Sequence, residues 1–189
     1  MAEVVLRVER ALPVRLVVLD VDGVLTDGGV YMGATADGVS VELKRFEITD
    51  QLGIKMMVWS GIEVALVSGR VSAANRLRAR ELDIPCFEGP GGRKLAIVEK
   101  LQAELGVGWP ETATVCDDLA DLPIFRRAGL AVAVANAVAE VRAVAHWVTS
   151  RRGGHGAVRE FAEALLRARG EWDTMVEQYC REREGVHTG

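Results

Sequence analysis

The sequence predicts an α/β fold: a three-layer, Rossmann-like parallel sheet with helices on both faces, a projecting β-hairpin and no cap domain. Short runs of β-branched residues alternate with longer helical patterns along most of the chain, which is typical of βαβ units. A glycine-rich stretch interrupts that alternation near the start of the chain. Polar segments follow several of the predicted strands, and the stretches of chain between these segments are too short to hold another domain.

Length and composition fit one large domain with a short appendage. The 189 residues are 49% hydrophobic and 26% charged, enough to bury a sizeable core. The net charge of -4 contains no basic block that could follow a phosphate backbone, and no apolar run is long enough to span a bilayer. We expect a cytoplasmic protein that binds neither nucleic acid nor membrane. The main domain is expected over 1–170, and a C-terminal amphipathic helix and tail over 171–189.

The elements of the sheet follow one another in regular order. Gly61, Gly106 and Gly129 each stand where a predicted helix should stop before the next strand, the usual place for a glycine cap. Six strands are expected at Val14–Leu19, Ile62–Val67, Cys86–Phe87, Thr112–Cys116, Leu130–Val134 and His146–Val148. Six helices are expected at Ile54–Ser60, Ala73–Leu82, Arg93–Leu105, Leu119–Ala128, Val138–Ala145 and Gly156–Arg169.

The segment from Gly28 to Phe46 is predicted to be the projecting hairpin. Its β-prone pieces, Val30–Met32 and Val39–Leu43, are joined through Asp37-Gly38, a pair that favours tight turns. A two-stranded ribbon is marginally stable in water unless it packs on something. We therefore expect this hairpin to be an assembly surface of a homo-oligomer.

Residues that could carry chemistry come directly after the predicted strands. In an open parallel sheet, ligands bind at the carboxyl ends of the strands, so these residues should meet at one rim. Several carboxylates so close together repel one another, and oxygen ligands favour a hard cation such as Mg²⁺. The residues are Asp20 and Asp22 after the first strand, Ser68, Gly69 and Arg70 after the second, Lys94 beyond the third, and Asp117, Asp118 and Asp121 after the fourth.

This combination predicts hydrolysis of a phosphate monoester. Asp20 can attack phosphorus to give an aspartyl phosphate, while Asp22 can protonate the leaving alcohol and later deprotonate a water. Lys94, the Ser68 hydroxyl and backbone N–H groups near Val21 and Gly69 can offset charge on the transferring phosphoryl oxygens.

In this order the residues resemble the haloacid dehalogenase superfamily of phosphatases, over Val14 to about Leu166. Within it, the chain is similar to the small capless branch typified by 3-deoxy-D-manno-octulosonate 8-phosphate (KDO 8-phosphate) phosphatases and their relatives acting on nonulosonate 9-phosphates. Besides the Asp20-to-Asp27 motif, the specific matches are Phe46 with Thr49-Asp50-x-x-Gly53-Ile54, and Gly153-Gly154-x-Gly156-Ala157-Val158-Arg159-Glu160.

The resemblance implies an Mg²⁺-dependent phosphatase that acts on a phosphorylated sugar acid in lipopolysaccharide biosynthesis. It implies that Asp20 is the nucleophile and Asp22 the acid/base, and that Asp20, the backbone carbonyl of Asp22 and Asp117 hold the metal. It also implies a homotetramer in which neighbouring hairpins pack together and help close each site. Substrate contacts are expected from Gly69, Arg70, Arg78 and Arg159.

Some assignments stay open at this point. Thr49-Asp50-Gln51 is closer to the nonulosonate 9-phosphate relatives, whereas Arg70 follows the KDO type, and Cys116 replaces the glycine usual before the Asp pair. Either Asp118 or Asp121 could orient Lys94 or a water, or cap the next helix; we favour Asp118 for the orienting role. A non-catalytic oligomerisation homologue is the remaining alternative, and the intact reactive residues argue against it.

Overall fold

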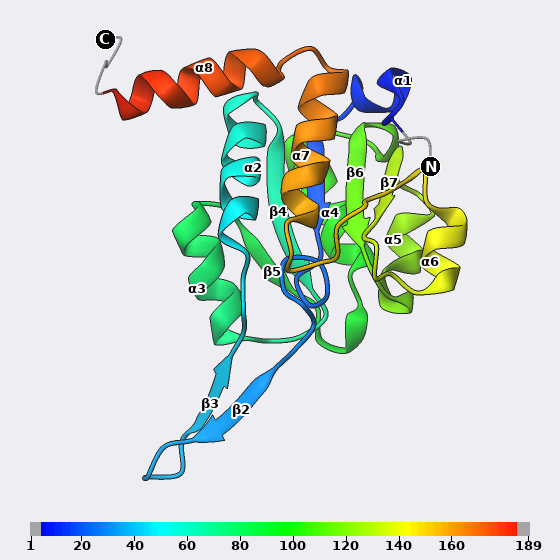
Figure 1. The fold of residues 1–189 in the computed structure, drawn as a ribbon. Coiled ribbons are helices and arrows are strands. Elements are labelled where there is room, and N and C mark those ends of the chain that lie inside the picture. The colour runs from blue at the N-terminus through cyan, green and yellow to red at the C-terminus, as the bar shows by residue number, and fades with distance from the viewer. Residues whose placement is uncertain (1–4, 185–189) are drawn as a thin grey trace.

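A six-stranded sheet, parallel throughout, forms the centre of the structure, a computed structural model that describes residues 5–184 (Figure 1). The strand order is β5-β4-β1-β6-β7-β8, which confirms the predicted architecture. The strands are β1 (Leu16–Leu19), β4 (Glu63–Ser68), β5 (Cys86–Glu88), β6 (Thr112–Cys116), β7 (Leu130–Ala133) and β8 (Trp147–Val148).

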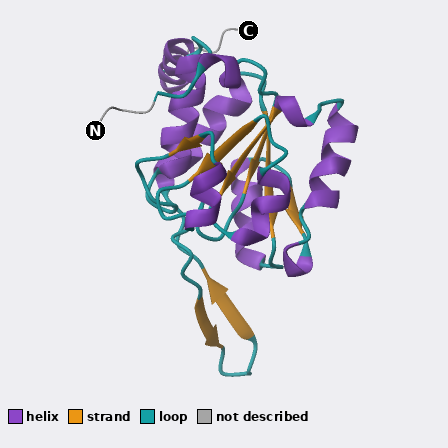
Figure 2. Ribbon diagram, turned by 90° about the vertical axis from the view of Figure 1, so that its right-hand side faces the viewer, coloured by secondary structure: helices purple, strands orange, loops and turns teal. Residues whose placement is uncertain are grey.

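Helices cover both faces of this sheet, as the view along its edge shows (Figure 2). On one face α2 packs closely against α7 and contacts α3, and on the other α4 contacts α5. The helices are α1 (Val8–Ala11), α2 (Ile48–Trp59), α3 (Ala73–Leu82), α4 (Leu95–Leu105), α5 (Leu122–Phe125), α6 (Ala139–Val144), α7 (Ala157–Ala168) and α8 (Trp172–Arg183). None of the helices in residues 5–184 is long and apolar enough to cross a membrane.

The central strand β1 is buried at all four positions, as expected for a strand covered on both faces. It pairs with β4, Leu16 beside Glu63, and with β6, Leu16 beside Thr112. The strands that follow β1 in the sequence, β4 and β5, are added on one side of it. The next strand, β6, pairs with β1 on its other side. The carboxyl ends of β1 and β6 are therefore neighbours where the winding reverses, the usual place for a ligand site in this architecture.

Two predicted helices differ from the observed ones for local reasons. α2 begins at Ile48, six residues before the expected start, because the Glu47 side chain caps it by accepting the Thr49 N–H. The expected helix Leu119–Ala128 is divided into a 3-10 turn over Leu119–Asp121 and the short helix α5, with Pro123 in the first turn of α5. Proline fits there because the first helical N–H groups have no intrahelical acceptor.

The hairpin consists of β2 (Tyr31–Ala34) and β3 (Ser40–Leu43), paired antiparallel, and it projects away from the sheet (Figure 1). Gly38 adopts a positive φ of 82° in the turn, which explains why glycine follows Asp37 there. At the base of the hairpin, a β-bridge joins Thr26 to Phe46. The projecting hairpin is thus present as predicted, and Tyr31, Met32, Val39 and Leu43 are exposed on it.

Candidate active site

The predicted reactive residues lie at the carboxyl ends of β1, β4 and β6, at the end of the sheet from which the hairpin projects (Figure 1). The loop after β1 turns tightly because the Val21 carbonyl accepts the N–H groups of Val24, Leu25 and Thr26. Gly23 is required in this turn: its φ is 89°, and a Cβ there would lie 1.9 Å from Oδ2 of Asp117. The sequence therefore brings the loops after β1 and β6 into direct contact.

Lys94 joins two of the buried carboxylates. Its Nζ lies 2.6 Å from Oδ1 of Asp20 and 2.6 Å from Oδ1 of Asp121, and the lysine side chain is only 3% exposed. Burial alone would lower the pKa of Lys94, but the charges of Asp20 and Asp121 outweigh it and raise that pKa above its ordinary value. The ammonium group is therefore held charged beside Asp20.

Asp117 and Asp121 complete an oxygen cluster with Asp20, since carboxylate oxygens of the three lie within 4.8 Å of one another. Burial, followed by the charge of Asp20, raises the pKa of Asp117 to about 7 and that of Asp121 to about 8. The raised pKa values reflect three carboxyl groups beside a single ammonium group in a buried setting, so the cluster lacks positive charge. This donor set fits a hard divalent cation such as Mg²⁺.

Asp22 contacts a lysine that sequence reasoning missed. Its Oδ1 lies 2.7 Å from Nζ of Lys44, whose side chain is fully buried although it follows directly after the exposed hairpin. The Asp22 side chain thus points toward the hairpin base rather than toward Lys94. The only sequence signal for this contact is the two-residue spacing of Glu42 and Lys44, which in an extended chain places both side chains on one side.

The segment after β4 also reaches the site. Ser68 is buried, and its hydroxyl oxygen accepts the Arg70 N–H at 3.1 Å. A Cβ at Gly69 would contact Gly92 Cα at 3.3 Å and Lys94 Cε at 3.8 Å, so the segment lies close beside the Lys94 loop. The Arg70 guanidinium is half exposed and pairs with Glu42 at 3.0 Å.

Arg78 and Arg159, the other two arginines expected at the substrate, make contacts outside the cluster. Arg78 is buried on α3, lies over the Phe46 ring, and pairs with Glu81 at 2.8 Å. The Arg159 guanidinium lies over the ring of Trp172, the first residue of α8, which lies at the end of the molecule opposite the hairpin (Figure 1). The structure does not bring the Arg159 guanidinium to the carboxylates.

Asp118 and Asp121 take different positions. The exposed Asp118 side chain accepts the Leu119 N–H and so caps the 3-10 turn. Asp121 is 1% exposed and contacts Lys94. Asp121 rather than Asp118 is therefore the residue that contacts Lys94, and the charge of Asp118 is one of the causes that raise the pKa of Asp117.

The Thr49-Asp50-x-x-Gly53 motif joins α2 to α7. Asp50 is fully buried, and its Oδ1 accepts the Arg159 backbone N–H at 2.7 Å, which caps the start of α7 from a neighbouring helix. Burial raises the pKa of Asp50 to about 6. A Cβ at Gly53 would lie 3.1 Å from Arg159 Cα, so glycine permits the close approach of the two helices.

The glycine-rich turn before α7 supports the loop after β1. The Gly154 N–H donates to the Val24 carbonyl at 3.0 Å, and a Cβ at Gly153 would lie 1.7 Å from the carbonyl oxygen of Gly23. Asn136 links the two segments, because its Oδ1 accepts the Gly153 N–H at 2.6 Å and its Nδ2 donates to the Gly23 carbonyl at 3.1 Å. No sequence motif indicated Asn136.

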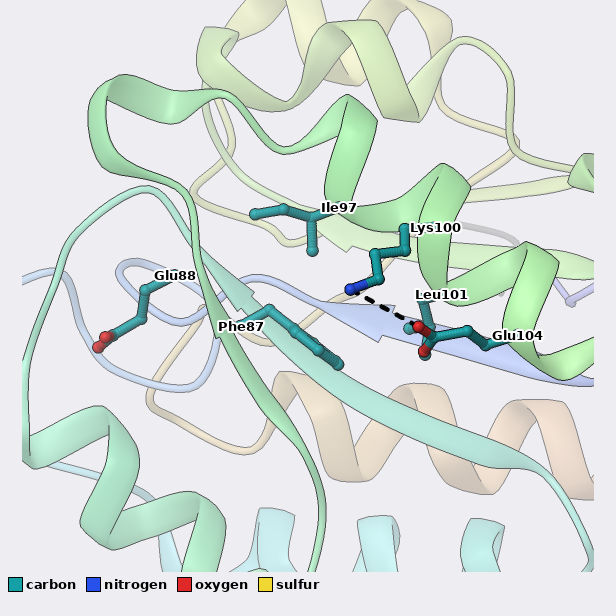
Figure 3. A pocket seen from close by; sticks show the side chains of 6 residues that line it. All are labelled: Phe87, Glu88, Ile97, Lys100, Leu101 and Glu104. Carbon is teal, nitrogen blue, oxygen red and sulfur yellow. Dashed lines mark ion pairs between the residues drawn. The ribbon is translucent and has the colours of Figure 1, made fainter.

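A shallow pocket elsewhere contains none of these residues. It lies between β5 and α4, and Figure 3 shows the ion pair between Lys100 and Glu104, both on α4, 3.7 Å long. Its lining is Phe87, Glu88, Ile97, Lys100, Leu101 and Glu104. The candidate active site is therefore the carboxylate cluster and not this pocket.

Comparison with known proteins indicates the family to which this chain belongs. The family model of the haloacid dehalogenase-like hydrolases matches residues 87–161. The KDO 8-phosphate phosphatase KdsC of Yersinia pestis is 38% identical over 161 residues, 85% of this chain and 84% of that protein. KdsC of Escherichia coli K12 is 39% identical over 173 residues, 91% of this chain and 88% of that protein. This chain belongs to the haloacid dehalogenase-like phosphatases.

Solved structures agree with this family. The KDO 8-phosphate phosphatase of Moraxella catarrhalis, in complex with magnesium, phosphate and KDO, superimposes with a TM-score of 0.84 at 35% identity, covering 91% of this chain and 97% of that one. A probable YrbI family phosphatase of Pseudomonas syringae gives a TM-score of 0.84 at 44% identity, covering 92% and 96%. The resemblance, the α/β fold and the phosphatase class are confirmed, while the roles of individual residues stay predictions.

Proposed function

We propose that this phosphatase hydrolyses KDO 8-phosphate through an aspartyl phosphate on Asp20, with Mg²⁺ as cofactor. The observation that supports it most is the cluster of Asp20, Lys94, Asp117 and Asp121 at the point where the sheet reverses its winding, in a chain whose relatives include KDO 8-phosphate phosphatases.

In the first step, an Asp20 carboxylate oxygen attacks phosphorus and the bond from phosphorus to the sugar oxygen breaks. Asp22 gives its proton to the departing oxygen. In the second step, water attacks the phosphorus of the aspartyl phosphate, Asp22 accepts the proton of that water, and the bond from phosphorus to Asp20 breaks. The products are the sugar acid and inorganic phosphate, and Asp20 and Asp22 return to their starting states.

The surrounding residues supply positive charge and orientation for these steps. Lys94 lies 2.6 Å from Asp20 and offsets negative charge at the reacting centre, and the buried Ser68 hydroxyl is available to the phosphoryl oxygens. Asp20, Asp117 and the backbone carbonyl of Asp22 would hold Mg²⁺, while Asp121 keeps Lys94 in place. When bound, the ion supplies counter-charge and orientation for the phosphoryl group.

Selectivity for a sugar acid is assigned to the open rim of the site. Arg70 is half exposed and lies on the segment after β4, so its guanidinium can exchange its Glu42 contact for a carboxylate of the substrate. A neutral sugar phosphate has no group that would compensate for the lost ion pair. The substrate carboxylate is therefore expected to contribute to recognition.

We expect kcat/KM for KDO 8-phosphate to exceed that for glucose 6-phosphate by a large factor in the presence of Mg²⁺. Arg70→Ala should remove about 1.5–3 kcal/mol of this preference, the range for a hydrogen bond to a charged group. Steady-state assays of released phosphate measure both quantities. A nonulosonate 9-phosphate belongs in the same screen: a higher kcat/KM for it would replace the proposed substrate, and equal rates on neutral hexose phosphates would refute a sugar-acid substrate.

We further propose that the chain is a homotetramer assembled through the hairpin. The exposed Tyr31, Met32, Val39 and Leu43 give the ribbon apolar surface that only a partner can bury. Light scattering should give a mass of about four chains, and deletion of 31–40 should give smaller species. A monomer of the intact protein would contradict this assembly.

A further inference from the structure

Lys44 stands out among the charged residues of the hairpin because its side chain is fully buried. Its Nζ lies 2.7 Å from Asp22 Oδ1, 2.9 Å from Asn75 Oδ1 and 3.7 Å from Glu42 Oε1. A buried ammonium group is costly unless acceptors surround it. Asn75 accepts a hydrogen bond from Lys44, and the carboxylates of Asp22 and Glu42 offset its charge as ion pairs, of which the one to the predicted acid/base is the shorter.

The position of Lys44 is itself held firmly. Glu42 lies in β3, two residues before Lys44. Its carboxylate accepts a hydrogen bond from the Ser72 hydroxyl. Asn75, fully buried on α3, accepts a hydrogen bond from the Lys44 ammonium group. The base of the hairpin is thus fastened to the segment after β4, and Lys44 has little freedom to move away from Asp22.

Each of the two reactive aspartates therefore has its own buried lysine. Lys94 holds Asp20 and comes from the start of α4, whereas Lys44 holds Asp22 and comes from the hairpin. The Asp22 side chain is 23% exposed, so without a partner its carboxyl group would be free to turn in solvent. Proton transfer requires a donor oxygen within hydrogen-bond distance of the leaving group.

We propose that Lys44 is a positioning residue for Asp22: its ammonium group fixes the Asp22 carboxyl group in the orientation that faces the leaving-group oxygen. This inference rests on the acid/base role of Asp22 in the proposed function. It makes the hairpin part of the catalytic machinery of its own chain, in addition to its proposed role in assembly.

Lys44→Met tests this inference, because methionine is of similar length but carries no charge and no donor. We expect kcat for alkyl phosphates to fall about 10–100-fold, the usual effect of losing a group that orients a catalytic residue. KM should change little. With p-nitrophenyl phosphate the loss should be much smaller, since its leaving group needs little protonation. Rates on a series of alkyl and aryl phosphates measure this dependence.

Three further variants separate positioning from a structural role. Asp22→Asn should show the same dependence on the leaving group, and Asp22→Asn with Lys44→Met should be no slower than Asp22→Asn alone, because the two residues act as one unit. Lys44→Gln keeps a hydrogen-bond donor and should recover part of the activity on alkyl phosphates. Lys100→Met is the matched control, since that lysine is 78% exposed on α4 and should leave all rates unchanged.

The outcomes of these assays distinguish the positioning role of Lys44 from the acid/base role of Asp22. If the loss of rate in Asp22→Asn depends on the leaving group but the loss in neither Lys44 variant does, the positioning role of Lys44 is overturned. The acid/base role of Asp22 then stands. Losses that multiply in the double variant would also overturn it. If Asp22→Asn itself affects all leaving groups equally, the acid/base role fails, and the inference about Lys44 fails with it.

Discussion

Asp20→Asn is expected to abolish hydrolysis, with kcat falling by roughly four orders of magnitude or more. The amide has the shape of the carboxylate but cannot serve as an anionic nucleophile. The fold should persist, because Lys94 keeps its second carboxylate, Asp121, at 2.6 Å when Asp20 loses its charge. Hydrolysis of p-nitrophenyl phosphate with Mg²⁺ measures the activity, and thermal unfolding measures the stability.

Asp173→Asn is a matched control for this experiment, since Asp173 is exposed in the first turn of α8, far from the site. It makes the same chemical change and should retain wild-type activity. Activity near wild type in Asp20→Asn would disprove the nucleophile assignment. Equal loss in both variants would show that the measured effect does not come from the site.

Gly153→Ala is expected to lower both stability and activity strongly. A Cβ at this position would lie 1.7 Å from the carbonyl oxygen of Gly23, so the two loops must move apart. Displaced backbone in a packed interior costs about 3 kcal/mol or more of the free energy of unfolding. Gly23 follows Asp22 in the sequence and lies against the Asp117 side chain. The same movement should therefore also reduce kcat. Denaturant unfolding and steady-state assays measure the two effects.

Gly33→Ala provides the comparison for Gly153→Ala. It makes the same substitution at a hairpin position where a Cβ would find no atom of its own chain within 4 Å, so the free energy of unfolding of the single chain should stay nearly unchanged. If Gly153→Ala matched this control in stability and kcat, the turn before α7 would not support the catalytic loop.

The sheet was predictable because most of its strands are short runs of apolar and β-branched residues that end at or just before a polar residue. The carboxylates after β1 and β6 were predictable for a related reason, since parallel strands bring their carboxyl ends to one rim. Local effects moved the boundaries: the Glu47 cap extends α2 toward its start, and Pro123 lies at the start of a shortened α5.

The residues that sequence reasoning missed act through tertiary contacts. Lys44 belongs to a hairpin that appeared to serve only assembly, and its buried end is visible only once the strand is placed beside Asp22. Asn136 carries no motif, yet it joins the Gly23 and Gly153 loops. Asp121 and Asp118 are equally acidic in the sequence, and only burial against Lys94 separates them.

The central place of β1 in the sheet has a consequence for biosynthesis. Residues 16–19 leave the ribosome first among the strands, yet their two neighbours are residues 63–66 and 112–115. This fully buried strand must therefore stay unpaired, or shielded by chaperones, while much of the protein is still being translated. The Gly153 turn, which braces the loop after β1, emerges later still. A nascent chain thus carries Asp20, the proposed nucleophile, long before the loops around it are in place, and we expect phosphatase activity only after translation has passed α7.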